Sequence, residues 1–363
     1  APVSMHDLHS WRDNRNELVH HRLIYVRTQE KMLGLRDSTK IRHRVCAFFP
    51  GVFVSMETSE REKPERDAAF VGYVRKILKA EGVAAERSIF WLYPKNSALK
   101  SLANEFKPLR TVVDVVDDHR TWPTVTHVQR EQLTEHYRDV LSRADFAFAN
   151  CIPVCDSMKQ FCPQIQLIPN GCDPNPEIVE PTGDEAYDHV KAFMGKIIGF
   201  VGNLESKIDI DLLATIASEC KDCLLVLIGS THANPSVRKL NRNSNVVMPG
   251  VVPYEEIGAW VRCFDVGIIP HLVTDLTKNM NPLKLFVYAS HGVPVVSTAV
   301  PNLPEWDRLQ AAKSKDEFIA KIKSVLATNG KSTTRQSVVS LPSWKDRLED
   351  PVSLVLESPI GDP

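Results

Sequence analysis

The chain lacks a long apolar run. A transmembrane helix needs about 20 consecutive, mostly apolar residues, and no such stretch occurs among the 363 residues. The first residues also lack the basic segment followed by an apolar one that marks a secretory signal. Because 43% of the residues are hydrophobic, a packed core is still feasible. These features predict a cytoplasmic globular protein, long enough for two domains.

An excess of charge of either sign is also missing. The sequence has 44 lysines and arginines against 45 aspartates and glutamates, which gives a net charge of −1. A general nucleic-acid-binding protein needs a basic surface that contacts phosphates. The composition therefore predicts that nucleic acid is not a partner.

The eight cysteines lack the spacing of a zinc site. Cys220 and Cys223 form one C-x-x-C pair, but no second pair and no closely spaced histidines complete a set of four ligands. The pair lies between a helix and an apolar strand, whereas a redox motif lies at a strand-to-helix corner. We therefore predict no metal site, and thiols that are reduced and mostly buried.

What the sequence does contain is an alternation of short apolar strands with amphipathic helices, which is typical of an α/β fold. No solenoid-type repeat or low-complexity tract interrupts it. Residues 208–220 illustrate the helices, because their apolar side chains recur on one face. The strands are predicted at residues 23–26, 45–49, 89–93, 111–116, 146–149, 166–168, 197–201, 224–228, 246–248, 266–269 and 294–297.

One stretch rich in proline and acidic residues, 173–188, shows no clear period. It predicts a linker between two doubly wound domains, one over residues 1–175 and one over residues 176–340. Residues 341–363 are predicted to form a C-terminal helix and tail, in which Ser343 is the N-cap. Residues 5–21 look helical although a doubly wound domain normally opens with a strand.

The most informative segment is NMNPLKLFVYASHGVPVVST, residues 279–298. Asn281 suits the N-cap of a helix, and Pro282 suits its first position, where a missing N–H costs nothing. The helix is predicted to end near Ser290, because Gly292 supplies a left-handed stop. A short buried parallel strand is predicted to follow.

Lys284 is unusual because it falls in the first turn of this predicted helix. The helix dipole disfavours a cation there by about 0.3–1 kcal/mol. An anion bound at the same helix end would offset that cost, since the free N–H groups and the lysine would both face it. The alternative is a lysine whose amine extends outward to solvent.

With this block and two Rossmann-like halves, the sequence resembles the GT-B glycosyltransferases, and most of all the family-4-like group. That group includes teichuronic acid-type and capsular or exopolysaccharide transferases. The similarity is densest over residues 165–306 and weaker in the first half. Its landmarks are IPNGCDP (168–174), IIGFVGNLESKIDIDLL (197–213), LVLIGS (225–230), NVVMPGVVPYEEI (245–257), FDVGIIP (264–270) and NPLKLFVYASHGVPVVS (281–297), with IFWLYP (89–94) and VVDVVDDH (112–119) in the first half.

The resemblance implies two Rossmann-like doubly wound domains that face each other across a cleft. It implies transfer of a sugar, hexosyltransferase-like and metal-independent, from a nucleotide diphosphate sugar to a glycan or lipid-linked acceptor in polysaccharide biosynthesis. The nucleotide sugar would be a substrate, so no cofactor is implied. The basic run over residues 27–44 is either a solvated face or, as in such enzymes, a contact with anionic lipid headgroups on the inner face of the membrane.

In such enzymes the second domain holds the donor, and its motifs carry over to this chain by position. The helix end around Lys284 and the glycine loop after residue 201 suit a phosphate. The donor-binding residues implied are Gly202, Asn203 and Lys207 at the diphosphate, Gly250 and Val251 at the base, and Asn279, Met280, Asn281 and Lys284 at the diphosphate and sugar.

Val287 departs from the family pattern. The helix usually reads K-L-x-E-Y, and its glutamate accepts hydrogen bonds from the ribose hydroxyls, which a valine does not. Val287 therefore predicts weakened ribose recognition, with Asn279 as a polar but uncharged substitute. This departure favours the alternative of a non-catalytic GT-B scaffold or partner subunit. A sugar-nucleotide epimerase, which would use the same donor pocket without an acceptor cleft, is a further alternative.

Acidic residues follow the predicted strand over residues 111–116. The carboxyl ends of strands form the ligand crevice of an open α/β sheet, and a carboxylate there can deprotonate an acceptor hydroxyl. Asp117 and Asp118 are the candidate catalytic residues, as the base of an inverting reaction or as groups that orient the acceptor in a retaining one. The alternative is that they cap the next helix or pair with Arg120.

Overall fold

The computed structural model describes residues 63–80, 82–94, 98–174, 176, 178–328 and 341–357. The predicted helix over residues 5–21, the strands over 23–26 and 45–49 and the basic run over 27–44 lie outside the described residues. The described chain divides into two compact units. The first unit holds residues 63–169 and 348–357, and the second unit holds residues 170–347.

The division between the units lies at Pro169 and Asn170, before the predicted boundary at residue 175. The predicted linker, residues 173–188, belongs to the second unit, and its last residues begin helix α7 (Glu185–Ala192). Asp184 caps that helix, because its carboxylate accepts from the backbone N–H groups of Ala186 and Tyr187. Asp184 and Glu185, which belong to the acidic stretch that predicted a linker, therefore begin a helix, where acidic residues are favoured.

The first unit is built on a parallel sheet of four described strands in the order β1-β2-β3-β4. Helices pack on the face of the sheet that carries Val113 and Val115, and the opposite face carries Val112 and Phe148 in contact with Val355. The elements are α3 (Lys63–Ala80), β1 (Ile89–Leu92), α4 (Leu99–Glu105), β2 (Arg110–Val115), α5 (His127–Leu141), β3 (Phe146–Ala149), α6 (Ile152–Met158), β4 (Gln166–Leu167) and residues 348–357 of α13 (Trp344–Glu357), with short 3-10 turns η1 (Ala85–Arg87) and η2 (His119–Thr121).

The second unit is built on a parallel sheet of six strands in the order β10-β9-β8-β5-β6-β7. Counted from β5, this is the 3-2-1-4-5-6 order of a doubly wound nucleotide-binding fold. The prediction of an α/β protein with two doubly wound halves is confirmed in the parallel sheets. The elements are β5 (Lys196–Val201), α8 (Ile210–Glu219), β6 (Cys223–Ile228), η3 (Pro235–Arg242), β7 (Val246–Gly250), α9 (Tyr254–Arg262), β8 (Val266–Ile269), α10 (Asp275–Lys278), α11 (Leu283–Ser290), β9 (Val295–Thr298), β10 (Leu309–Ala312) and α12 (Lys315–Thr328).

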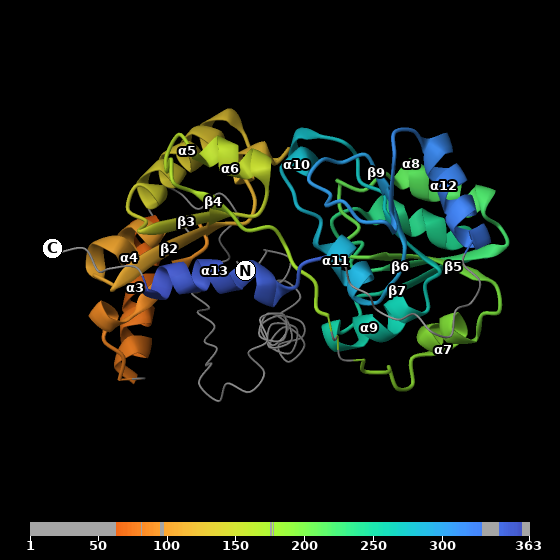
Figure 1. The fold of residues 1–363 in the computed structure, drawn as a ribbon, viewed down its shortest axis with the longest axis horizontal. Coiled ribbons are helices and arrows are strands. Elements are labelled where there is room, and N and C mark those ends of the chain that lie inside the picture. Colours follow the sequence, from red (N-terminus) through yellow and green to blue (C-terminus); the bar gives the residue numbers. More distant parts are fainter. Residues whose placement is uncertain are drawn as a thin grey trace. The chain divides into compact units, whose positions relative to one another are not determined.

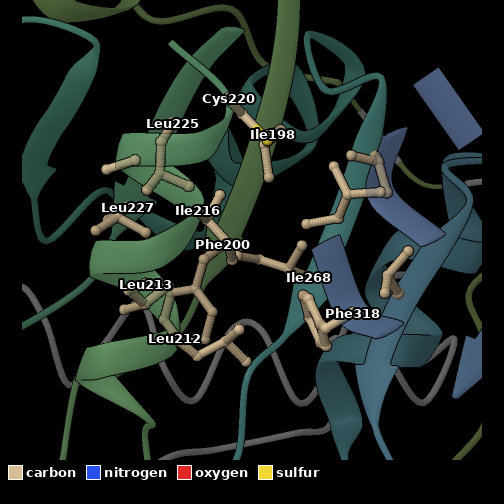
Figure 2. Packing of buried hydrophobic residues seen from close by; sticks show 14 of the residues in the cluster. Ile198, Phe200, Leu212, Leu213, Ile216, Cys220, Leu225, Leu227, Ile268 and Phe318 are labelled. Carbon is tan, nitrogen blue, oxygen red and sulfur yellow. The ribbon is translucent and has the colours of Figure 1, made fainter. Parts of the chain in front are cut away.

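Helices cover both faces of this sheet (Figure 1). α8 and α12 pack on one face, and α7, α9 and α11 pack on the other. Figure 2 shows the first of these interfaces, where Phe200 of β5 and Phe318 of α12 are both fully buried. Burial of one large apolar side chain stabilises the folded state by about 1.5–3 kcal/mol. The helices on both faces therefore stabilise the sheet. The carboxyl ends of its strands are thereby held in a constant arrangement.

The C-terminal helix was predicted correctly, together with its cap. Ser343 precedes α13, and its Oγ accepts from the backbone N–H of Asp346 at 3.1 Å. The Asp346 carboxylate in turn accepts from the backbone N–H of Ser343 at 2.8 Å. This reciprocal pair satisfies two backbone donors that a helix start leaves free.

Candidate functional site

In the second unit, the candidate site lies at the carboxyl ends of the central strands. β5 and β8 are neighbours where the strand order reverses, and ligands of doubly wound sheets bind outside the carboxyl ends of the strands at such a point. The loop after β5 (residues 202–209) and the loop after β8 (residues 270–274) are joined there. Asp209 donates its backbone N–H to Pro270 O at 2.8 Å, and Leu272 donates to Lys207 O at 2.8 Å.

Three glycines form the backbone at this edge. Gly202, Gly229 and Gly250 come at the carboxyl ends of β5, β6 and β7, with φ angles of +132°, +136° and +86°. A Cβ on Gly229 would lie 2.1 Å from the Gly202 carbonyl oxygen, so no side chain fits between these loops. Left-handed backbone and close approach both require glycine. The backbone conformation therefore favours glycine at positions 202 and 250, which the sequence analysis proposed as donor-binding residues. Gly229 is a third glycine of this kind, and it was not predicted from the sequence.

Lys284 lies in the first turn of α11, as predicted, and its amine points toward the strand ends. Its Nζ lies 3.0 Å from Nε2 of His271 and 5.3 Å from the centre of the Phe200 ring. A Cβ added to Gly202 would lie 3.7 Å from the same Nζ. The alternative of an amine extended outward to solvent is therefore wrong.

The charges around Lys284 leave it without an acidic partner among the described residues. Lys207 lies near it but forms its own ion pair, with Nζ 3.3 Å from Glu205 Oε2. Burial, and then the charge of Lys207, lower the pKa of Lys284 to about 7, although Glu205 acts in the opposite direction. The site therefore holds two lysines against one glutamate, and a bound anion would favour the charged form of Lys284.

His271, like Gly229, lies at these strand ends and was not predicted from the sequence. It is 1% exposed, and burial followed by the charges of Lys284 and Lys207 lowers its pKa well below the usual value. Thr298 Oγ1 donates to its backbone oxygen at 2.7 Å. The one available signal was its position directly after the apolar strand β8, in FDVGIIPH.

Asn281 does not cap α11, and this part of the prediction was wrong. The N-cap residue is Pro282, and no side chain caps the helix. Asn281 instead accepts at Oδ1 from the backbone N–H of Asn170 at 2.9 Å and donates from Nδ2 to Asn302 O at 2.9 Å. Leu285 donates its backbone N–H to Pro282 O at 3.1 Å, and no side chain caps the N–H groups of the two residues before it.

The residues just before Asn281 are also held by local contacts. Asn279 follows α10 and donates from Nδ2 to Asp275 O at 2.6 Å, which closes that short helix. The backbone oxygen of Met280 accepts from Asn302 Nδ2 at 3.3 Å. Asn302 has a φ of +64°, which Asn tolerates better than most residues. A role for Asn279 and Met280 in donor binding stays a prediction.

The remaining predicted donor residues lie at the ends of β5 and β7. Asn203 donates from Nδ2 to Glu205 Oε1 at 3.3 Å. Val251 follows Gly250 and is 58% exposed, which is high for a valine. An exposed apolar side chain beside a glycine turn suits the flat face of a base, so the predicted role of Val251 remains open to test.

Val287 lies one turn after Lys284 and packs against the core of the second unit. It lines a pocket of about 60 Å³ together with Tyr254, Glu255 and Ser290. A pocket this size accommodates a few water-sized groups. Val287 therefore offers an apolar wall at the position where the family carries a glutamate.

In the first unit, the two candidate catalytic carboxylates have different surroundings. Asp118 is 3% exposed, caps η2, and accepts from Arg120 Nη2 at 2.8 Å and from Ser157 Oγ at 3.1 Å. Burial alone would raise its pKa, but the hydrogen bonds and charge of Arg120 outweigh burial and lower it. Such a carboxylate is a weak base. For Asp118 the structure thus favours the alternative of a cap paired with Arg120.

Asp117 remains the candidate base at the end of β2. Its side chain is partly exposed, and its backbone oxygen accepts from the Tyr137 hydroxyl at 3.2 Å. Inside the strand, Asp114 accepts from Trp91 Nε1 at 3.2 Å, and burial raises its pKa to about 6. Among the described carboxylates of this strand, Asp114 is therefore the one whose pKa is raised toward neutral pH.

Comparisons with known proteins agree with these features. Residues 195–328 match the family model described as Glycosyl transferases group 1. TuaH of Bacillus subtilis (strain 168), named as a teichuronic acid biosynthesis glycosyltransferase, is 28% identical over 163 residues. That match covers 41% of this chain and 40% of TuaH, so the chain spans less than half of this curated relative.

Solved structures resemble the chain over most of its length. A sucrose-phosphate synthase from Thermosynechococcus elongatus is 16% identical and has a TM-score of 0.64, with 93% of each chain covered. A glycosyltransferase from Rickettsia africae ESF-5 is 13% identical, with a TM-score of 0.57 over 84% of this chain and 83% of its own. HepE of Anabaena, in complex with UDP and glucose, is 12% identical, with a TM-score of 0.55 over 79% of this chain and 81% of its own.

These findings confirm the resemblance to GT-B, family-4-like glycosyltransferases. The chain has the GT-B fold, and the part of its second unit over residues 195–328 resembles the glycosyl transferases group 1 family. Among the described residues, no three histidine, cysteine or acidic side chains are grouped as metal ligands. No helix in the same part of the chain is long and apolar enough to span a bilayer.

Proposed function

We propose that this protein transfers a sugar from a nucleotide diphosphate sugar to a glycan or lipid-linked acceptor in polysaccharide biosynthesis. The observation that carries the proposal is the position of Lys284. Its amine lies beside Gly202 at the strand-order reversal, at the uncapped start of α11, and forms no ion pair with a described carboxylate. A diphosphate suits this place, since helix N–H groups and lysine amines both bind phosphate oxygens.

In the proposed reaction, the bond between the anomeric carbon and the diphosphate breaks, and negative charge develops on the departing nucleoside diphosphate. Lys284 and Lys207 stabilise that charge more strongly in the transition state than in the bound donor. Asp117 takes the proton of the acceptor hydroxyl if the reaction inverts the anomeric carbon. If the reaction retains the configuration, Asp117 orients the acceptor.

The finer features of the proposal rest on the family resemblance. The transferred sugar is a hexose, and the reaction needs neither a metal ion nor a cofactor. The protein acts in the cytoplasm at the inner face of the membrane, where the basic run over residues 27–44 attracts anionic headgroups. The near-neutral net charge supports the absence of a nucleic-acid partner.

A thermal-shift screen with UDP, GDP, TDP and CMP tests donor binding directly, because a ligand of the native state raises its stability by mass action. Calorimetry with the best ligand should show that Lys284→Ala weakens binding by about 1–3 kcal/mol, the range for a lost charge-assisted hydrogen bond. Lys239→Ala, on the exposed face of η3, is the control. Equal affinity of the Lys284 variant and the parent contradicts the proposed diphosphate site.

Val287 favours a second candidate, a GT-B scaffold or partner subunit that no longer binds a donor. A sugar-nucleotide epimerase is the other alternative, because it uses the donor pocket without an acceptor. Incubation with the donor alone separates the three. An epimerase changes the sugar, a transferase releases nucleoside diphosphate mainly when an acceptor is added, and a scaffold does neither.

A further inference from the structure

Lys284 and His271 form a contact between two basic groups where an ion pair would be expected. Nζ of Lys284 and Nε2 of His271 are 3.0 Å apart. The other ring nitrogen of His271, Nδ1, is buried and has no hydrogen-bond partner within the described chain. Lys284 is partly buried. A lysine removed from solvent in this way is commonly matched by a carboxylate, and the described residues place none in an ion pair with it.

The charged and titratable groups around this pair come from two loops. His271 comes from the β8 loop, and Lys207 and Glu205 come from the β5 loop. Lys207 disfavours a charge on Lys284, whereas Glu205 favours it but lies in an ion pair with Lys207 at 3.3 Å. β5 adds the uncharged ring of Phe200, 5.3 Å away. The balance of these neighbours disfavours a positive charge on Lys284.

Hydrogen bonding explains what His271 does in this arrangement. A charged lysine only donates, so a charged Lys284 requires that Nε2 of His271 accept and that the ring proton lie on Nδ1. A neutral Lys284 can instead accept from Nε2–H. His271 thus holds the amine in place in both states. It adds no compensating charge, because burial keeps its pKa far below neutral.

We infer that Lys284 binds the donor diphosphate together with one proton from solvent, and that His271 is the positioning residue that holds the amine for this step. The inference rests on the proposed function, since the diphosphate is the anion concerned. The proton passes from water or buffer to Nζ of Lys284, and no covalent bond to the ligand forms or breaks. Donor affinity is then coupled to pH.

The expected size of the coupling follows from the free protein. With a pKa of about 7, most of the Lys284 amine is neutral at pH 8. A bound diphosphate favours the charged form, so binding at pH 8 should take up between about half and one proton per nucleotide. By linkage, the binding constant should fall up to about tenfold per pH unit above pH 7, until the pH passes the raised pKa of the complex.

Calorimetry at pH 8 in two buffers of different ionisation enthalpy measures the number of protons taken up. UDP, GDP and TDP are the probes, because nucleoside diphosphates are already fully ionised at this pH. The parent should take up at least about half a proton with each probe that binds. Lys284→Arg, which is charged at every pH used, should bind with no uptake and with an affinity that is flat from pH 7 to pH 9. Lys239→Arg is the matched control on η3 and should behave as the parent.

His271 is tested by the pH profile, which a purely structural role would not move. His271→Leu removes the acceptor for the charged amine, so the fall in affinity should begin at a lower pH than in the parent. His271→Gln restores an acceptor and should return the profile toward that of the parent. If Lys284→Arg does not fold, Lys284→Met replaces it and should show weaker binding without proton uptake.

The possible outcomes separate this inference from the proposed function. Binding to the parent without proton uptake overturns the inference and leaves the donor site intact. Proton uptake that persists in Lys284→Arg or Lys284→Met also overturns it, because another group then titrates. If none of the three probes binds the parent, the proposed donor site fails, and the inference fails with it.

Discussion

Asn170 donates two hydrogen bonds to Asn281, which lies 111 residues away in sequence. The backbone N–H of Asn170 donates to Asn281 Oδ1 at 2.9 Å, and Asn170 Nδ2 donates to Asn281 O at 2.8 Å. Asn170 is the residue at which the chain enters the second unit. The pair therefore fixes that entry to the segment that precedes α11 and Lys284.

Asn281→Ala should destabilise the protein by about 1–3 kcal/mol, because it leaves the backbone N–H of Asn170 and the oxygen of Asn302 without their partner. Urea unfolding followed by fluorescence measures the change. The matched control is Asn241→Ala on the exposed face of η3, which should change stability by less than about 0.5 kcal/mol. Equal effects of the two variants contradict the role assigned to the Asn281 contacts.

Gly229→Ala should lower both stability and nucleotide affinity. The new Cβ would lie 2.1 Å from the Gly202 carbonyl oxygen, and the φ of +136° is strained for alanine, so the backbone beside Lys284 has to shift. Gly72→Ala in α3 is the control, because nothing lies within 4 Å of a Cβ there. It should leave stability unchanged or raise it by up to about 1 kcal/mol. Parental nucleotide affinity in Gly229→Ala would speak against this edge as the donor site.

Asp117→Asn and Asp118→Asn should have different effects. Asp117→Asn removes the proposed base, so turnover should fall by about 10²–10⁴-fold, while donor binding, assigned to the second unit, is unchanged. Asp118→Asn weakens the pair with Arg120 and should lower the melting temperature. Steady-state kinetics and thermal unfolding distinguish the two. Near-parental turnover in Asp117→Asn would leave Asp114 as the next carboxylate to test.

The pH dependence of stability provides a test that needs no ligand. The pKa of Lys284 in the folded protein is lowered from 10.5 to about 7, so the unfolded chain binds more protons between these values. Stability of the free protein should therefore rise with pH from about pH 7 toward pH 10. Thermal unfolding over this range measures the slope. Lys284→Met should reduce that slope, and Lys239→Met should keep it.

Val287→Glu tests the departure from the family pattern. The added carboxylate should strengthen nucleoside diphosphate binding if it reaches the ribose hydroxyls, and calorimetry measures the change. Unchanged affinity or an unfolded variant would show that position 287 serves core packing. The second result has a clear physical basis, since Val287 packs against the core of the second unit and beside Glu255 in the small pocket.

Local patterns in the sequence were sufficient for most of the secondary structure. The strands over residues 146–149 and 266–269 have the predicted bounds, and the cap at Ser343 is formed as expected. Strand β10 (Leu309–Ala312) was not predicted, because LQAA has neither the β-branched residues nor the apolar run of a buried strand. It becomes a strand by pairing with β9 at the edge of the sheet.

The alternation of strands and helices, the family resemblance and the position of Lys284 in the first turn of a helix could all be predicted from the sequence. These features depend on neighbours within about one helical turn or on fixed spacing. Only the tertiary structure decided that Asn281 binds Asn170 instead of capping α11, that Asp118 is engaged with Arg120 and Ser157, and that His271 meets Lys284. The reason is that parallel pairing joins strand ends that are remote in sequence, so burial and partners at those ends follow from strand order.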